Sequence, residues 1–226
     1  AGAGIGRPGR SGRVTRGLVM DRSHTIGILG SGQLGRMLAQ AGASLGVRCR
    51  FLDAVGDAHT PAAALGDVWG DGFDDTETLG RFASGLTVAT YDFENVPLHA
   101  ARALEASLPV RPSPRSLEIA QDRQHERDMF DRLGIPTPRH AGVGTLDELE
   151  RAIFDGFPLP AILKTRRFGY DGKGQARLTG PGDLAQAWES VGQPPSVLEG
   201  FVDFTREIAV IVARSLPGEP ICDHPG

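Results

Sequence analysis

The chain has 226 residues, 40% of them hydrophobic, which is enough for one large domain or two small ones with apolar cores. Its formal net charge of -4 excludes a general attraction to nucleic acid or anionic membranes, so any anion site must be local. No apolar run approaches the roughly 18 residues of a membrane helix, and Cys49 and Cys222 suggest neither a zinc site nor a disulfide framework. We therefore expect a cytoplasmic protein with no nucleic acid and no membrane among its partners.

The first 23 residues are expected to be a disordered extension. Residues 1–19 carry four arginines, no acidic residue and no apolar core of the kind that a signal peptide requires. A transit peptide has a similar composition, but the segment lacks an amphipathic pattern. An upstream extension of the reading frame, with Met20 as the start, is the interpretation we favour.

Residues 24–53 follow the order strand, glycine turn, helix and strand, which predicts a parallel βαβ unit. Helical spacing predicts that one apolar face of this helix is buried against the sheet, formed by Leu34, Met37, Leu38, Ala41 and Leu45.

The glycines of the turn leave three interpretations open. Gly30, Gly32 and Gly35 match G-x-G-x-x-G, and Asp53 ends the second strand where a ribose-binding acid would lie, as in dinucleotide-binding proteins. The glycines could instead serve only a tight turn and close helix packing. A third interpretation keeps the phosphate-binding amides and helix N-terminus for a different phosphorylated ligand.

A further strand is predicted over 86–91, followed by an acidic loop. Ligands of open α/β sheets bind at the carboxyl ends of strands, so Glu94 would meet the same ligand as the glycine turn. The alternative is that Glu94 and Asn95 only cap the helix over 98–106.

The second half begins with a proline-rich joint and reads as an α+β unit. One helix is predicted from Ser116 to the stop at Gly134, and a second follows a Thr145/Glu148 capping box. A later strand ends in Glu199, and residues 207–214 alternate as a half-buried strand that would expose an edge.

The loop "TRRFGYDGKG" joins two expected antiparallel strands, so it fails the P-loop pattern, which leads into a helix. Its three glycines allow the backbone to curve and donate amide hydrogens, while Lys164 and Lys173 supply positive point charges. This combination of donors and charges is suited to binding a polyphosphate. Asp171 indicates a second ligand that is cationic or carries an amine. The alternative is a solvated surface hairpin.

Five segments together resemble the ATP-grasp family, and within it the 5-(carboxyamino)imidazole ribonucleotide synthases of microbial purine biosynthesis. They are "GILGSGQLGRML", "YDFENVP", "QDRQHERDMFDRLGIPTP", "KTRRFGYDGKGQ" and "VLEGFVDFTREIAVI". The resemblance covers residues 24–214 and implies an α/β chain with a Rossmann-like pre-ATP-grasp domain over 24–115. The first part of an ATP-grasp α+β fold would follow over 116–226, and the resemblance argues against dinucleotide binding.

The resemblance also implies roles for individual residues. ATP would be bound by Arg123, Lys164, Gly169, Tyr170, Asp171, Gly172, Lys173, Gly174, Gln175, Glu199, Gly200, Phe201, Val202 and Glu207. Aminoimidazole ribonucleotide would face Gln33, Glu94, Tyr170 and Asp171, with Asp171 as the candidate catalytic residue. Arg127 stands where relatives often have lysine and is expected to carry only a surface charge.

The implied reaction uses ATP to phosphorylate bicarbonate, and the carbon dioxide released from carboxyphosphate is captured by the amine of 5-aminoimidazole ribonucleotide. Its Mg²⁺ ligands are expected beyond residue 226, so we expect an incomplete enzyme of weak or no activity. Relatives commonly form dimers. Two alternatives remain: another ATP-grasp ligase, or a nonenzymatic nucleotide-binding fragment.

Overall fold

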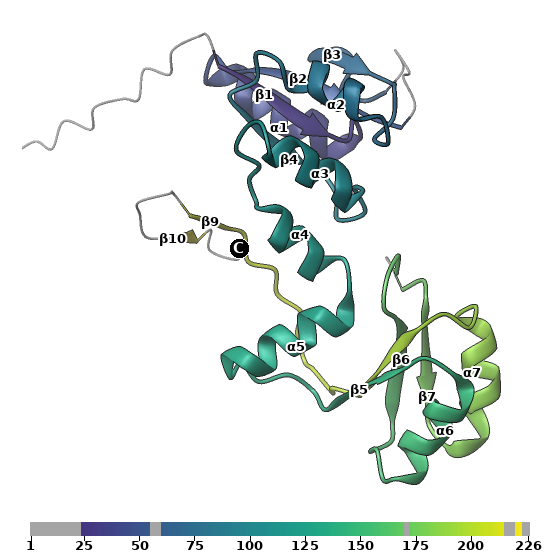
Figure 1. Cartoon of the computed structure of the whole chain (residues 1–226). Coiled ribbons are helices and arrows are strands. Elements are labelled where there is room, and N and C mark those ends of the chain that lie inside the picture. Colours follow the sequence, from purple (N-terminus) through teal and green to yellow (C-terminus); the bar gives the residue numbers. More distant parts are fainter. Residues whose placement is uncertain (1–23, 55–59, 170–171, 215–219, 223–226) are drawn as a thin grey trace, which may run out of the picture. The chain divides into compact units, whose positions relative to one another are not determined.

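The computed structural model describes residues 24–54, 60–169, 172–214 and 220–222 (Figure 1). The expectations for residues 1–23, and for Tyr170 and Asp171, lie outside this part of the chain. The chain divides into two compact units, Ala1–Glu118 and Ile119–Gly226. None of the described helices is long and apolar enough to cross a membrane.

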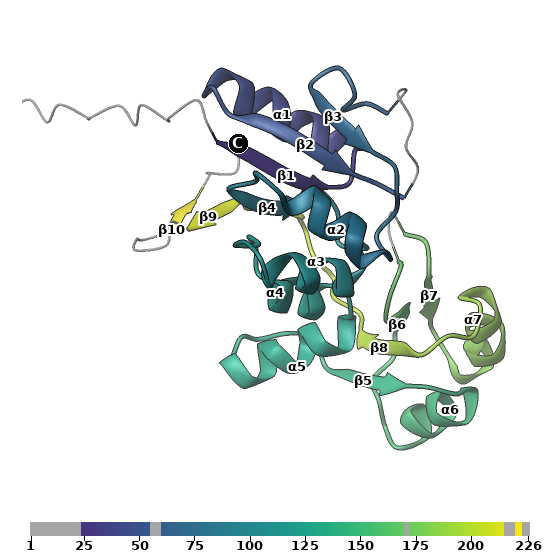
Figure 2. The same ribbon diagram turned by 45° about the horizontal axis from the view of Figure 1, so that its top comes forward.

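The first unit is a parallel sheet with helices on both faces. Its strands run in the order β3-β2-β1-β4, and Figure 2 shows α1 on one side of them and α2 and α3 on the other. The elements are β1 (Thr25–Leu29), α1 (Gln33–Ser44), β2 (Arg48–Leu52), β3 (Gly66–Trp69), α2 (Thr76–Ala83), β4 (Val88–Tyr91), α3 (Leu98–Glu105) and α4 (Pro114–Ala120). This confirms the parallel βαβ unit that the sequence pattern predicted and the Rossmann-like arrangement that the resemblance implied.

Helix α1 does not bury the face that helical spacing predicted. Leu34, Met37, Leu38 and Leu45 are between 46% and 65% exposed, whereas Gly35 and Ala39 are buried. The reason is close packing, because a β-carbon at Gly35 would lie 2.9 Å from Asp92 Oδ2. The small residues of the helix therefore face the sheet, and its large apolar residues do not.

The second unit is built on an antiparallel sheet in the order β5-β8-β6-β7. Helices α6 and α7 share one apolar core with this sheet (Figure 1), formed by residues such as Leu149, Leu163, Trp188 and Leu198. The elements are α5 (Arg123–Leu133), β5 (His140–Val143), α6 (Leu146–Phe154), β6 (Ala161–Thr165), β7 (Gln175–Leu178), a 3₁₀ turn (Pro181–Asp183), α7 (Leu184–Ser190), β8 (Ser196–Gly200), β9 (Val212–Arg214) and β10 (Pro220–Cys222).

The single helix predicted over 116–134 is instead two helices, α4 and α5. Asp122 has extended backbone angles and caps α5, since its carboxylate accepts a hydrogen bond from Gln124 N at 2.9 Å. The predicted stop is confirmed, because Gly134 follows the helix in the left-handed conformation.

The strand predicted over 207–214 is also wrong in extent. Only Val212–Arg214 forms a strand, and its partner is β10. The preceding residues have no strand or helix, and Ile208 and Ile211 are 69% and 73% exposed.

Strand alternation separates the apolar and charged residues of the second sheet. Leu163 and Leu198 are paired neighbours in β6 and β8 and face the core beneath α6 and α7. Lys164 and Glu199 each follow one of these leucines, so both point to the opposite face. Two opposite charges from separate strands are therefore brought to the same side of the sheet.

Candidate functional site

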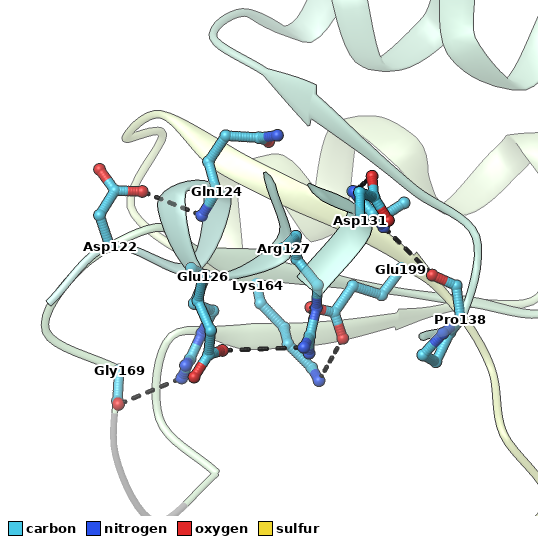
Figure 3. A network of polar contacts seen from close by, with 11 residues as sticks. Asp122, Gln124, Glu126, Arg127, Asp131, Pro138, Lys164, Gly169 and Glu199 are labelled. Atoms are coloured by element: carbon cyan, nitrogen blue, oxygen red, sulfur yellow. Dashed lines mark hydrogen bonds and ion pairs between the residues drawn. The ribbon is translucent and has the colours of Figure 1, made fainter. Parts of the chain in front are cut away.

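A buried carboxylate with two cations forms the centre of the candidate site. Glu199, whose side chain is only 4% exposed, accepts a hydrogen bond from Lys164 Nζ to Oε2 at 2.7 Å (Figure 3). Arg127 of α5 contacts the other oxygen, Oε1, through Nε and Nη2, both at 2.9 Å. Burial acts to raise the pKa of Glu199, but the hydrogen bonds from Arg127 and Lys164 outweigh it and the pKa is lowered.

Arg127 is therefore not the surface charge that the sequence suggested. Its side chain is 17% exposed and makes a two-point contact with a buried carboxylate. Helical spacing in the sequence could have indicated that Arg127 belongs to the site. Arg127 lies four residues after Arg123, so both side chains leave the same face of α5.

Arg123, the first residue of α5, lies at the root of the glycine loop. Its Nη2 donates to the carbonyl of Gly169 at 3.2 Å, and its Nε is buried without a hydrogen-bond partner among the described residues. Arg123 N also donates to Arg166 O at 2.9 Å. A cation with an unused donor beside a glycine loop is suited to binding an anion.

The described part of the loop is shaped by its glycines. Gly172 and Gly174 have positive φ angles of 77° and 68°, a conformation that favours glycine. At Gly174 a β-carbon would also lie 2.6 Å from Thr165 Oγ1, so the loop packs directly on the end of β6. Lys173 and Gln175 are exposed on this loop, while Tyr170 and Asp171 lie outside the described residues.

The chain beyond β8 supplies the remaining residues that the resemblance assigned to ATP. The backbone amides of Gly200 and Phe201 donate hydrogen bonds to the carbonyls of Arg139 and Pro160, at 2.8 and 3.0 Å respectively. The Phe201 ring is 38% exposed with the Arg177 guanidinium 4.3 Å from its centroid, and Val202 is 47% exposed. Glu207 is exposed and lies within residues 201–211, which have no strand or helix.

In the first unit, the glycine turn is occupied by side chains of the protein. Asp92 Oδ2 accepts from Gly35 N at 3.0 Å, and a β-carbon at Gly30 would overlap Asp92 Oδ1. Burial raises the pKa of Asp92. Asp53 accepts hydrogen bonds from Ser31 N and Oγ at 2.8 and 2.5 Å. Asp92 thus uses a backbone amide at the start of α1 that a pyrophosphate would need, and Ser31 uses the Asp53 carboxylate that a ribose would need, which argues against that interpretation.

The two expected substrate residues of this unit are both exposed. Gln33 lines a shallow cavity of about 320 Å³ together with Asp53, Asp92 and Phe93. Glu94 accepts a hydrogen bond from the neighbouring Asn95 side chain at 3.4 Å, and α3 begins after Pro97 without a side-chain cap. The alternative that Glu94 and Asn95 cap α3 is therefore wrong.

The described residues contain no group of His, Cys, Asp or Glu side chains that could hold a metal ion. They do not fit a magnesium site by themselves, and we assign no metal ligand within them.

Comparison with known proteins identifies two domain types. Residues 23–121 match the ribonucleotide synthetase preATP-grasp domain, and residues 128–225 match the ATP-grasp domain. The chain thus consists of a preATP-grasp domain followed by ATP-grasp sequence. It is 45% identical over 194 residues to N5-carboxyaminoimidazole ribonucleotide synthase of Pseudomonas aeruginosa, covering 86% of this chain and 53% of that protein. The resemblance and the fold class predicted from the sequence are thus confirmed.

Solved structures agree with this assignment. N5-carboxyaminoimidazole ribonucleotide synthetase from Thermus thermophilus has 44% identity and a TM-score of 0.78, covering 87% of this chain and 52% of that one. The synthase from Aspergillus clavatus, in complex with ADP and 5-aminoimidazole ribonucleotide, has 25% identity and a TM-score of 0.77, with coverage of 89% and 52%. The chain spans about half the length of the relatives it matches.

Proposed function

We propose that this chain binds ATP and serves the ATP- and bicarbonate-dependent carboxylation of 5-aminoimidazole ribonucleotide to N5-carboxyaminoimidazole ribonucleotide. The observation that carries the proposal is the set of Arg123, Lys164 and Glu199 at the root of the glycine loop. It is supported by relatives that are named for this reaction and by a relative solved with ADP and the ribonucleotide.

In this proposal the second unit holds the nucleotide. Lys164 and Arg123 would neutralise the phosphates, and the backbone amides of residues 169–175 would fold over them. Glu199, with Gly200, Phe201 and Val202, would line the adenine pocket, and Glu207 would take the ribose. Gln33, Glu94, Tyr170 and Asp171 would face the ribonucleotide, with Asp171 close to its amine.

The reaction transfers the γ-phosphoryl group of ATP to a bicarbonate oxygen, leaving ADP and carboxyphosphate. Carboxyphosphate breaks into carbon dioxide and phosphate, and the amine nitrogen of the ribonucleotide then bonds to the carbon and loses a proton. Residues of this chain would contribute charge neutralisation, positioning and exclusion of water. Magnesium would accompany ATP. We further propose a cytoplasmic location and a homodimer.

Calorimetric titration of the chain with ATP tests the binding step. We expect saturable binding that Lys164→Met weakens by roughly 10- to 100-fold, the range for one charged hydrogen bond. Glu150→Gln, which changes an exposed carboxylate on α6, is the matched control. No ATP binding by the unaltered chain would refute the proposal.

Phosphate release from ATP tests the chemistry, with the Pseudomonas aeruginosa relative as positive control. Release that requires both bicarbonate and 5-aminoimidazole ribonucleotide would support the carboxylation. ATP binding without such release would instead favour a nucleotide-binding module.

A further inference from the structure

Each carboxylate oxygen of Glu199 has its own cation. Oε1 accepts from Arg127 and Oε2 accepts from Lys164, at 2.9 and 2.7 Å (Figure 3). Because the Glu199 side chain is 4% exposed, its charge must be balanced by protein groups and not by solvent. One buried negative charge is thus shared by two positive charges. Glu126 also approaches Arg127 Nη1, at 3.7 Å, but it is 35% exposed and more strongly screened.

The two cations differ in how easily they can leave. Arg127 is held by two nitrogens on Oε1, and its guanidinium lies 5.9 Å from the centroid of the Phe130 ring. Within the part of the chain that the structure describes, Lys164 makes one ion pair, through a flexible side chain that is 26% exposed. Lys164 is therefore the cation that can move to another anion while Arg127 stays.

We propose that Arg127 is a positioning residue of the nucleotide site, which keeps Glu199 paired while Lys164 transfers to an ATP phosphate and frees Oε2 to accept from the 6-amino group of adenine. This inference rests on the proposed function. Without Arg127, departure of Lys164 would leave Glu199 buried and unpaired, a state that is strongly unfavourable. Arg127 therefore sets both the availability of Lys164 and the acceptor character of Glu199.

A selectivity among purine nucleotides follows from this arrangement. A carboxylate kept ionised by Arg127 can accept from the amino group of adenine, but it repels the carbonyl oxygen that hypoxanthine carries at the same position. The site should prefer ATP to inosine triphosphate. Loss of Arg127 should therefore weaken ATP binding and also reduce the preference for ATP over inosine triphosphate.

The test is calorimetric titration of the full chain and its variants with ATP and with inosine triphosphate. For Arg127→Gln we expect roughly 10- to 100-fold weaker ATP binding, which corresponds to the free energy of a charged hydrogen bond. The ratio of the affinity for ATP to that for inosine triphosphate should fall roughly tenfold. Arg127→Lys keeps one point charge and should restore the preference for ATP with intermediate affinity. Arg132→Gln removes an exposed cation from the last turn of the same helix and should change neither quantity.

A double variant separates positioning from a general structural effect. If Arg127 acts through Glu199, then Arg127→Gln should weaken ATP binding by no more than about threefold in a Glu199→Gln background. Fully additive losses, or equal losses for both nucleotides, would overturn the inference. Thermal unfolding verifies that each variant folds. If Arg127→Gln does not fold, the test uses Arg127→Lys instead, and an unchanged ATP affinity of that variant would overturn the inference. Absence of ATP binding by the unaltered chain would instead be a failure of the proposed function.

Discussion

Asp122 connects the start of α5 to the root of the glycine loop. Its carboxylate caps the helix through Gln124 N and accepts from Arg166 Nε and Nη2, at 2.9 and 2.7 Å. Burial acts to raise the pKa of Asp122, but the hydrogen bonds from Arg166 and Gln124 outweigh it and lower the pKa. Because Arg166 directly follows β6, this pair fixes where the loop leaves the sheet.

Asp122→Asn should lower the free energy of unfolding at pH 7 by about 1–3 kcal/mol, since the two-point ionic contact is lost. A carboxylate with a lowered pKa stabilises the fold above its unfolded pKa and loses this effect as pH falls through its folded pKa. The difference between the variant and the unaltered chain should therefore shrink below about pH 4.

Urea unfolding at pH 7 and at several acidic pH values measures this difference. Glu150→Gln, which changes an exposed carboxylate of the same unit, should show almost none. A difference for Asp122→Asn that is equal at all pH values would contradict the ionic origin of the effect.

Individual site residues were predictable where the sequence carries a local pattern. Lys164 at a strand end, the loop glycines and Glu199 all follow from strand boundaries and glycine spacing. The partner of each carboxylate did not follow, because Asp122 and Arg166 are 44 residues apart and Asp92 reaches Gly35 across 57. Pairing over such distances depends on how the elements pack.

At the scale of elements, α1 shows how packing overrides a sequence pattern. Its leucines have the spacing of a buried face, yet the helix places Gly35 and Ala39 against the sheet because Asp92 and the turn come too close for larger side chains. The periodicity correctly predicted a helix but not its buried side. The helix predicted over 116–134 failed for a related reason, since Asp122 is engaged by Arg166 and starts a new helix.

The glycine loop offers a matched pair of substitutions. Gly172 and Gly174 both have positive φ, but only at Gly174 would a β-carbon meet Thr165, whereas at Gly172 the nearest atom is Gln175 Nε2 at 3.7 Å. Gly172→Ala should cost about 1 kcal/mol of unfolding free energy from backbone strain alone. Gly174→Ala should cost about 1–3 kcal/mol more, since its side chain also crowds β6.

Chemical denaturation of the two variants measures these costs. The hydrogen bond from Thr165 N to Gly174 O, at 2.8 Å, should weaken only in Gly174→Ala, which amide hydrogen exchange at Thr165 can detect. Equal costs and equal exchange in both variants would show that the contact with Thr165 contributes nothing.

At the scale of the whole molecule, the order of strands and helices predicted an α/β unit followed by an α+β unit, and the structure has both. The apolar alternation of residues 207–214 predicted a longer strand than the structure contains. Alternation indicates that a segment can pair along a sheet edge, but it does not supply the partner.

Trypsin should therefore cut after Arg206 early in a limited digestion. Arg206 is exposed within residues 201–211, which have no strand or helix, whereas Arg127 is largely buried in α5. Mass spectrometry of the first fragments identifies the site. ATP should slow this cleavage if Glu207 binds ribose, and equal rates with and without ATP would contradict that role.

The carboxylate of Asp92 in the glycine turn has a consequence for how such motifs are used. The fingerprint G-x-G-x-x-G is commonly taken as a sign of a bound coenzyme, but here the protein itself supplies the anion that the turn accommodates. The motif encodes a backbone shape that a tethered side chain can fill as well as a diffusible molecule. A search that scores the glycines alone would therefore count this chain among dinucleotide-binding proteins.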